Sequence, residues 1–448
     1  MKVTDLPKIS SIKGDEVLML VKNGVSYQAT LDDIRSGEPD AKGLYPDVPI
    51  NYVEIVRYSG QESTTVVTNG NTSLIDKIWS GVMPCTIDRN GLVTQMLNGN
   101  DTTKTVDGLP AVLDDWSQPC MVRYGGYWTK YFYNAADNTK HFRFSPYKVK
   151  GYKYVRRRFL AMHGGTVETH DSKQMLLSNA GAWTTQNMNI QAYHAAAKNL
   201  GSTFRVRAVQ DRKVYRDMFW LMEGTFNSQS IQQGCNGVSW GWWGKFSQAD
   251  NGGASQYAQF YKNGVTNSVK GHKGEVSITV NNGESDATVK AQKWGWIEAW
   301  LSGPYWLWES GALKKADKWY FAKDINSFTS FDPTGDEYQY LCEAVKESEK
   351  YILENFEDTI IPSLVGGTDH TGHCDQYWRA EDASGNNVYI PAGSGGANNG
   401  SNLGVSVLNS NNVVSNANPN YGSALANNIP IIEIMTKVVS WEMATMRI

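Results

Sequence analysis

Alternating apolar and polar residues predict short strands in several parts of the chain. Residues 15–30 contain two apolar-rich runs around Asn23-Gly24, and this pattern predicts a β-hairpin because Asn-Gly suits a tight turn. Val53 and Ile55 alternate with polar residues in the same way. We therefore expect a hairpin at the start of the chain and strands soon after it.

Helical spacing of apolar residues predicts two helices in the middle of the chain. The Ala-rich run over 187–200 ends before Gly201, and Thr184 or Thr185 is the expected cap at its start. The segment 211–223 carries apolar side chains on more than one face, so this second helix should be largely buried.

Two further helices are expected nearer the C-terminus. The first spans 336–358, where the stripe with 3-4 spacing consists of Tyr338, Leu341, Val345, Ser348 and Ile352. The second spans 429–448 and is amphipathic, so its apolar face should pack in a groove of this chain or of a neighbouring subunit. We favour a subunit contact for it.

On this pattern the chain divides into four units. From the N-terminus, these are a short hairpin unit, a Pro/Gly-containing linker with edge strands, a long central domain and an apolar tail. Their bounds are 1–37, 38–74, 75–428 (with insertions at 235–290 and 336–358) and 429–448.

The tract from Gly385 to Asn428 is rich in Asn and Gly and carries no charged residue. One interpretation is a low-complexity loop, because such a composition buries little apolar surface. The other is a set of short strands joined by Asn/Gly turns, since Val405 and Val407 alternate with small residues. We favour the second interpretation, which makes the tract a displayed surface.

The order of motifs in this tract carries a resemblance to a known family. The positions concerned are Gly395-Gly396, Asn399-Gly400-Ser401-Asn402, Gly404, Leu408-Asn409, Asn416, Asn418, Asn420 and Gly422. They resemble the closing segment of C-type-lectin-fold domains in receptor-binding proteins of tailed bacteriophages, which are related to formylglycine-generating enzymes and to tropism determinants diversified by retroelements. Residues 120–146, 225–230 and 293–311 also resemble family segments, although Gly303-Pro304 replaces a Gly-Asn.

The resemblance implies an α+β fold. In the implied C-type-lectin-like domain two helices pack on a twisted, mostly antiparallel sheet, and a small N-terminal β-hairpin unit precedes it. The implied function is a virion fibre or tail-tip protein that binds the bacterial host surface, attached to the particle through residues 1–37. A hairpin packed on its own domain is the alternative for that unit. The family's copper chemistry is not carried over, because the closing segment lacks its pair of cysteines.

Composition narrows the classes of partner. A net charge of -3 over 448 residues argues against a nucleic-acid partner, and no apolar run approaches the roughly 18 residues of a membrane span. The 16 Trp, 23 Tyr and 13 Phe suit a β-rich domain or a sugar-binding surface. The five cysteines form no CxxC pair, which predicts buried thiols. We expect localisation in the virion after synthesis in the bacterial cytoplasm.

Exposed amides of the tract are the expected receptor-binding groups, because an Asn side chain both donates and accepts hydrogen bonds. The residues are Asn398, Asn399, Ser401, Asn402, Asn409, Asn411 and Asn412, with Tyr389 and Tyr421 as aromatic anchors. The alternative is turn-forming Asn that satisfies its own backbone. Trp240, Trp242 and Trp243 lie among glycines and either stack on a sugar ring or pin their loop to the core.

No spacing of residues predicts catalysis, so we expect a protein that is not an enzyme and holds no cofactor. One cluster offers nitrogen, sulfur and oxygen ligands within seven residues: Asp369, His370, His373, Cys374 and Asp375. No second Cys/His pair lies at metal-finger spacing, and an ordinary loop is the simpler interpretation.

The expected partners follow from the implied function. We expect a homo-oligomer, with a trimer as the favoured order, that contacts other virion proteins through its N-terminal segment and a glycan or protein on the host surface. Two alternatives stay open. One is a structural decoration or connector of the capsid or tail, and the other is a glycan-degrading tail enzyme, which would need two carboxylates facing one groove.

Overall fold

The computed structural model describes residues 51–58, 67–233, 238–247, 256–298, 303–382 and 384–428, together with the backbone of two N-terminal strands, β1 (Val17–Lys22) and β2 (Val25–Thr30). β1 pairs antiparallel with β2, which confirms the predicted hairpin. The rest of the first 50 residues and the predicted helix over 429–448 lie outside the described residues.

The fold is mostly β-structure, with 39 % strand and 12 % helix, and the four α-helices of the described chain accompany several sheets that include a half-barrel. It is not a helix-over-sheet α+β lectin fold, so the predicted fold class is wrong. The physical reason is that aromatic and β-branched residues favour strands, and they pack in strands along most of the described chain. Two helices cannot cover that much sheet.

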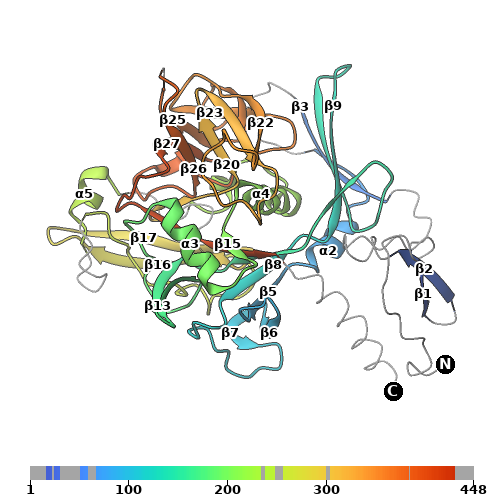
Figure 1. The fold of residues 1–448 in the computed structure, drawn as a ribbon, viewed down its shortest axis with the longest axis horizontal. Coiled ribbons are helices and arrows are strands. Elements are labelled where there is room, and N and C mark those ends of the chain that lie inside the picture. The colour runs from blue at the N-terminus through green and yellow to red at the C-terminus, as the bar shows by residue number, and fades with distance from the viewer. Residues whose placement is uncertain are drawn as a thin grey trace.

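A five-stranded sheet is built from the first described strands and a long hairpin. Its order is β11 (Lys153–Val155), β9 (Tyr127–Asn134), β10 (Thr139–Ser145), β3 (Val53–Tyr58) and β4 (Val67–Gly70). The predicted strand at Val53 and Ile55 is therefore confirmed as β3. The β9–β10 hairpin extends well beyond the body of the molecule (Figure 1).

A seven-stranded sheet forms the middle of the molecule and brings the end of the tract beside much earlier strands. Its order is β15 (Phe204–Val206), β29 (Leu425–Asn428), β12 (Arg158–Ala161), β8 (Cys120–Tyr124), β5 (Met83–Ile87), β6 (Val93–Asn98) and β7 (Asp101–Thr105). β6 and β7 form a lobe at the lower end in Figure 1.

A ten-stranded sheet holds most of the C-terminal third. Its path is β22 (Tyr338–Glu343), β21 (Lys318–Ala322), β20 (Ala312–Lys315), β26 (Val388–Gly393), β27 (Leu408–Val413), β25 (Gln376–Arg379), β23 (Lys350–Asn355) and β24 (Pro362–Val365). Off this path, β19 (Trp306–Trp308) pairs with β26 and with β28 (Tyr421–Ser423).

The helix predicted over 336–358 is wrong, because this segment forms β22 and β23 instead. Tertiary pairing overrides its helical spacing: Trp319 of β21 lies opposite Cys342, and Tyr351 of β23 lies opposite Gln376. Between the two strands, Glu349 has a φ of 57°, which a helix interior does not allow. Val405 and Val407, predicted in a strand, lie in a buried turn before β27.

Smaller elements complete the fold. They are β13 (Thr166–His170) with β14 (Lys173–Leu177), β16 (Gly274–Asn281) with β17 (Asp286–Trp294) and β18 (Ile297–Glu298), and the helices α2 (Leu74–Trp79), α5 (Trp240–Lys245), η2 (Ser228–Ser230) and η3 (Gly400–Asn402). No helix in the described ranges is long and apolar enough to cross a membrane.

The two central helices form as predicted. α3 (Ile190–Leu200) begins at Asn189, whose side chain accepts a hydrogen bond from Ala192 N, so the cap predicted at Thr184 or Thr185 is wrong. α4 (Val209–Glu223) is buried along most of its length, as expected, and ends at Gly224 with a φ of 65°.

Buried ion pairs tie α4 to the strands around it. Asp211 at its start pairs with Arg205 of β15 and, at 3.0 Å, with Arg158 of β12. Glu309, which follows β19, pairs with Arg207 at 2.7 Å and with Arg212 of α4 at 2.9 Å. Because all of these groups except Arg158 are almost fully buried, each carboxylate depends on its arginines.

Candidate functional site

Helix α5 divides the three predicted tryptophans between the surface and the core. The Trp243 side chain is fully buried and donates its indole N–H to Ala258 O at 3.2 Å, so it pins the loop. Trp242 is half-buried and donates its indole N–H to Ser285 Oγ at 3.0 Å. Trp240 keeps 50 % of its surface exposed, so of the three it is the one that presents a ring to solvent.

The exposed Trp240 ring is held in place by other aromatic rings. Its centroid lies 4.3 Å from that of Tyr257 and 5.9 Å from that of Trp243, which meets it edge-on. A ring fixed in this way loses little conformational freedom when a ligand stacks on it. The pair Trp240 and Tyr257 is therefore suited to the apolar face of a sugar.

The Asn/Gly tract meets this helix at Gly396. A Cβ at Gly396 would lie 2.8 Å from the Trp243 ring and 3.1 Å from Asn398 Oδ1, so the glycine allows the tract to approach the indole closely. Asn399 Oδ1 accepts a hydrogen bond from Gly396 N at 2.9 Å and closes the turn. Two sets of predicted residues, far apart in sequence, thus lie together.

The short helix η3 continues the same surface. Ser401 is exposed and donates its hydroxyl to Asp369 Oδ2 at 3.1 Å, while Asn402 Oδ1 accepts a hydrogen bond from the Tyr351 hydroxyl. Asn398 and Asn399 are half-buried. We call this surface the η3–Trp240 face, formed by Asp369, Trp240, Asn398, Asn399 and the residues of η3.

The remaining predicted residues of the tract lie elsewhere and bond to one another. The buried Tyr421 hydroxyl accepts hydrogen bonds from Asn409 Nδ2 at 3.2 Å and Asn412 Nδ2 at 2.7 Å. Asn412 Oδ1 in turn accepts bonds from Asn416 at 2.7 Å and Asn418 at 3.0 Å. This network fixes the turn between β27 and β28.

Two predicted contact residues have contrasting positions in the ten-stranded sheet. Tyr389 is 6 % exposed in β26, with Lys314 Nζ lying 4.3 Å from its ring centroid. Asn411 is exposed within β27, and its backbone N–H donates to Asn409 Oδ1 at 2.8 Å. Neither residue lies within the η3–Trp240 face.

The candidate metal cluster is divided between the surface and the interior. Asp369 and His370 lie on the surface, whereas His373, Cys374 and Asp375 are buried. His373 Nε2 faces Arg57 at 3.1 Å and Asn355 at 3.3 Å. No group of three or more His, Cys, Asp or Glu side chains in the described ranges is placed to hold a metal ion.

A groove borders the η3–Trp240 face. It has a volume of about 530 Å³ and is lined by Gln229–Gln233 and by Lys273, Gly274, Glu275 and Lys290. Gln229 donates its amide to Leu403 O, the residue after η3, which joins the groove to the face. Gln232 is 8 % exposed and donates its amide to Gly274 O at 3.0 Å, while its buried Oε1 has no hydrogen-bond partner among the described residues.

This groove was not predicted from the sequence, although the sequence carries a signal for it. The run Gln229–Gln233 contains three glutamines shortly after α4, and side-chain amides in a short turn are typical of sites that bind hydroxyl groups. The charged side chains beside them are already paired: Lys273 with Glu223 at 2.8 Å and Lys290 with Glu275 at 2.6 Å. The groove is therefore suited to a neutral, hydroxyl-rich ligand.

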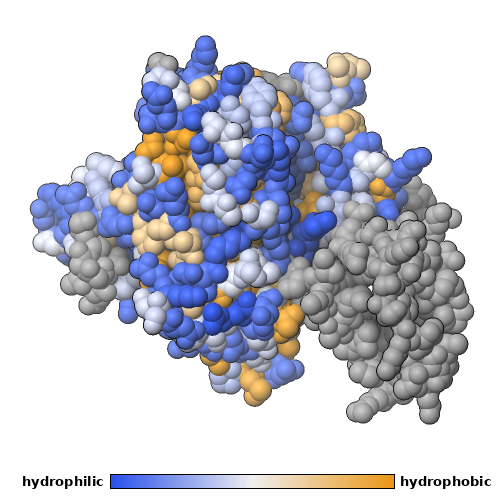
Figure 2. All heavy atoms as spheres, viewed as in Figure 1, coloured by the Kyte–Doolittle hydropathy of each residue, from blue (hydrophilic) through white to orange (hydrophobic). Residues whose placement is uncertain are grey.

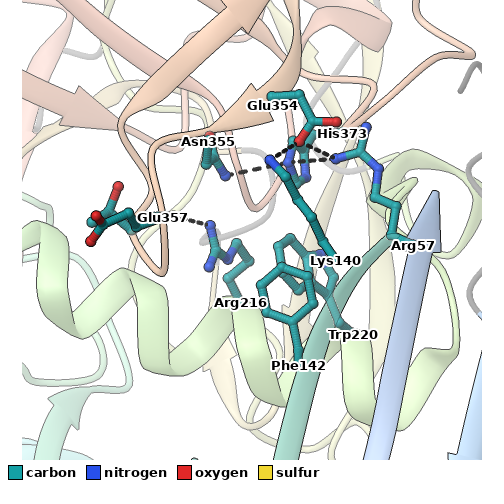
Figure 3. Close-up of a pocket in the computed structure, with 10 residues that line it drawn as sticks. Arg57, Lys140, Phe142, Arg216, Trp220, Glu354, Asn355, Glu357 and His373 are labelled. Carbon is teal, nitrogen blue, oxygen red and sulfur yellow. Dashed lines mark hydrogen bonds and ion pairs between the residues drawn. The ribbon is translucent and has the colours of Figure 1, made fainter. Parts of the chain in front are cut away.

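A second, internal cavity lies where the five-stranded sheet meets α4 and β23 (Figure 3). Arg57 of β3 and Lys140 of β10 both point at the Glu354 carboxylate. The distance from Arg57 Nη1 to Glu354 Oε2 is 3.7 Å. Burial, with Arg57 nearby, holds the pKa of His373 well below its usual range, and the neutral ring stacks on Trp220 at 5.2 Å.

The size of this cavity argues for a structural role. At about 10 Å³ it has room for a single water, which is too small for a sugar or a nucleotide. Most of its residues come from β3, β10, α4 and β23, so their contacts join the five-stranded sheet to the rest of the fold.

No family model matches the sequence, and no curated protein matches it. What the molecule does is therefore inferred from its own residues.

Proposed function

We propose that this protein is a bacteriophage virion component, a fibre or tail-tip protein, that binds a glycan of the bacterial host surface through the η3–Trp240 face. The proposal rests on the half-exposed Trp240 ring, which is held by Tyr257 and packs edge-on against Trp243, the indole that the tract approaches at Gly396. An aromatic ring with a few polar groups at its edge is the usual arrangement of a sugar site.

The Asn/Gly tract gives this face its chemistry. Asn398 and Ser401 offer an amide and a hydroxyl without adding charge, since the tract has no charged residue. The hydroxyl groups of a neutral glycan can both donate to and accept from these side chains, while the carboxylate of the face, Asp369, already accepts a hydrogen bond from Ser401. The implied oligomer and the attachment through residues 1–37 belong to the same proposal.

Binding of whole cells and of a glycan array by the full-length protein tests the proposal. The variants are Trp240→Ala and the pair Asn398→Ala with Ser401→Ala, and Tyr133→Ala is the matched control because it removes another ring that is 50 % exposed. Loss of stacking should weaken binding about tenfold, equivalent to roughly 1–1.5 kcal/mol. The control should bind as the wild type does. Wild-type protein that binds no cell and no glycan refutes the proposal.

A structural connector of the capsid or tail is the second candidate, and a separate observation favours it. The lobe of β6 and β7 exposes Val106 (58 %), Leu109 (64 %) and Val112 (47 %), and apolar side chains gather at this lower end in Figure 2. Clustered exposed apolar residues are typical of subunit contacts.

Sedimentation tests this second candidate. Leu109→Lys should lower the oligomeric order, whereas Leu364→Lys, at a position that is 47 % exposed in β24, should not. An unchanged oligomer, or equal loss in both variants, argues against a subunit contact at this lobe.

A further inference from the structure

The segment from Pro146 to Arg158 is strongly basic in a chain whose net charge is -3. It contains six Lys and Arg residues and no acidic residue. Its middle forms β11, an outer strand of the five-stranded sheet. The fold therefore gathers this charge along one edge of a sheet.

Glycines at the neighbouring turn place the arginines. Gly125 and Gly126 have φ values of 89° and 86°, and Gly126 N donates to Val155 O at 2.7 Å. A Cβ at Gly126 would lie 2.6 Å from Arg157 Nε, so the guanidinium rests directly over the glycine. The close approach requires glycine and fixes Arg157 at the edge.

Helix α2 and the aromatic residues extend the basic surface. Lys77 of α2 is exposed and donates to the Tyr147 hydroxyl at 2.7 Å. Lys148 Nζ lies 5.8 Å from the centroid of the Trp128 ring. These aromatic contacts place the two lysines beside the edge.

Four cations of this edge form no ion pair within the described part of the chain. Arg158 turns inward and pairs with Asp211 at 3.0 Å. The side chains that remain exposed are Lys150, Lys153, Arg156 and Arg157, and no ion pair joins them to another described residue. Like charges within one short segment repel one another, so an anionic partner lowers the energy of the edge.

We propose that this edge, the β11 basic face (Lys150, Lys153, Arg156 and Arg157, flanked by Lys77 and Lys148), binds an acidic polysaccharide with phosphate or carboxylate groups along its chain. The inference rests on the proposed function, which brings the protein to a bacterial envelope. It adds a second contact of different chemistry, because the η3–Trp240 face suits a neutral glycan. The overall negative charge of the chain disfavours nucleic acid as the occupant.

Affinity electrophoresis of the full-length protein tests this face. The probes are alginate for carboxylates, poly(glycerol phosphate) for phosphates, neutral dextran, and duplex DNA. The variant changes Lys150, Lys153, Arg156 and Arg157 to Glu. The matched control reverses four exposed lysines scattered elsewhere, and thus has the same net charge: Lys173, Lys270, Lys323 and Lys346.

The wild type should bind at least one acidic polymer and not dextran, and raising the salt from about 50 to about 300 mM should weaken binding at least tenfold, because exposed charges are screened. The affinity of the face variant for the acidic polymers should fall at least tenfold, and that of the control less than threefold. A milder variant with Gln at the same four positions should lose an intermediate amount, and it replaces the Glu variant if that protein does not fold.

Three results would overturn the inference: equal loss in the face variant and the control, equal binding of dextran, or tighter binding of DNA than of both acidic polymers. Failure of the proposed function is seen separately. If Trp240→Ala reduces cell binding while the face variant does not, the proposed function holds and this inference fails. If binding of acidic polymers depends on the β11 basic face but the protein binds no cell, this inference holds and the proposed function fails.

Discussion

Replacing the buried Asp375 with Asn should stabilise the protein near neutral pH. Asp375 is fully buried after β24, and burial raises the pKa of its carboxyl to about 8 even though Ser406 N donates to Oδ2 at 2.7 Å and Arg212 is near. Its other oxygen has no hydrogen-bond partner among the described residues and lies close to Gly404. The folded protein therefore holds this carboxyl protonated at neutral pH.

The sign and size of the effect follow from linkage. An unfolded Asp has a pKa of about 3.9, so the folded value is the higher one, and the stability that the proton contributes is present below pH 4 and lost as the pH rises towards 8. pH 7 lies about 3 units above the pKa of the unfolded Asp, so deprotonation stabilises the unfolded state by roughly 4 kcal/mol at that pH. Asn keeps the acceptor for Ser406 N and does not titrate.

Guanidinium denaturation of the wild type and Asp375→Asn between pH 5 and 8 measures this. The free energy of unfolding of the variant should exceed that of the wild type by an amount that grows by roughly 4 kcal/mol over this range. A difference that stays flat with pH would refute the reasoning, because it would mean that Asp375 is ionised in the folded protein throughout.

Asp211→Asn is the matched control, since the same change is made at another fully buried carboxyl. There Arg205 and Arg158 hold the pKa of Asp211 at about 2 against the opposing effect of burial. Its folded pKa lies below the unfolded one, so its stability is present above pH 4 and the Asn variant should be destabilised by about 3–5 kcal/mol at pH 7. At pH 7 the changes in the free energy of unfolding must therefore have opposite signs in the two variants.

Three further predictions concern other buried groups. Glu354→Gln should lower the free energy of unfolding by about 3–5 kcal/mol, because it leaves Arg57 and Lys140 facing each other, and thermal denaturation with and without added salt checks this. Tyr421→Phe removes the acceptor of two Asn amides and should cost about 1–3 kcal/mol in urea denaturation. Burial lowers the pKa of His194 to about 4, so on acidification from pH 6.5 to 4 the wild type should lose roughly 3 kcal/mol of stability relative to His194→Gln, which urea denaturation of both proteins across this range measures.

Local signals in the sequence predicted several elements correctly. The Asn-Gly pair marked the first hairpin, Gly201 marked the end of α3, and the apolar spacing of α4 matched its burial. Each of these signals depends on neighbouring residues alone, which is why the sequence carries it.

The errors share a different physical cause. Residues 336–358 have helical spacing, but β21 and β25 offer open strand edges to which this segment pairs. Propensity is a weak preference compared with the hydrogen bonds and burial that a long-range partner supplies. The fold class was wrong for the same reason, since the strands of the three large sheets come from distant parts of the chain.

Part of the candidate site could be predicted from residue types, but its grouping could not. Trp240 was identified among glycines, and Asn398 among amides, yet only the packing of Trp243 on Gly396 brings them together. Tyr421 was expected to contact a receptor because an exposed and a buried Tyr look alike in sequence. The structure places its hydroxyl within the Asn network instead.

The buried ion pairs that stabilise the fold and the tract side chains that we propose to bind a glycan belong to different parts of the chain. Buried pairs such as Glu309 with Arg207 and Arg212 hold α4 to the strands, and losing one carboxylate there costs about 3–5 kcal/mol. The tract that carries Asn398 has no charged residue, and substitutions at such surface positions usually change stability by less than about 0.5 kcal/mol. Side chains of the η3–Trp240 face can therefore change with a new ligand while the ion pairs that define the fold stay intact.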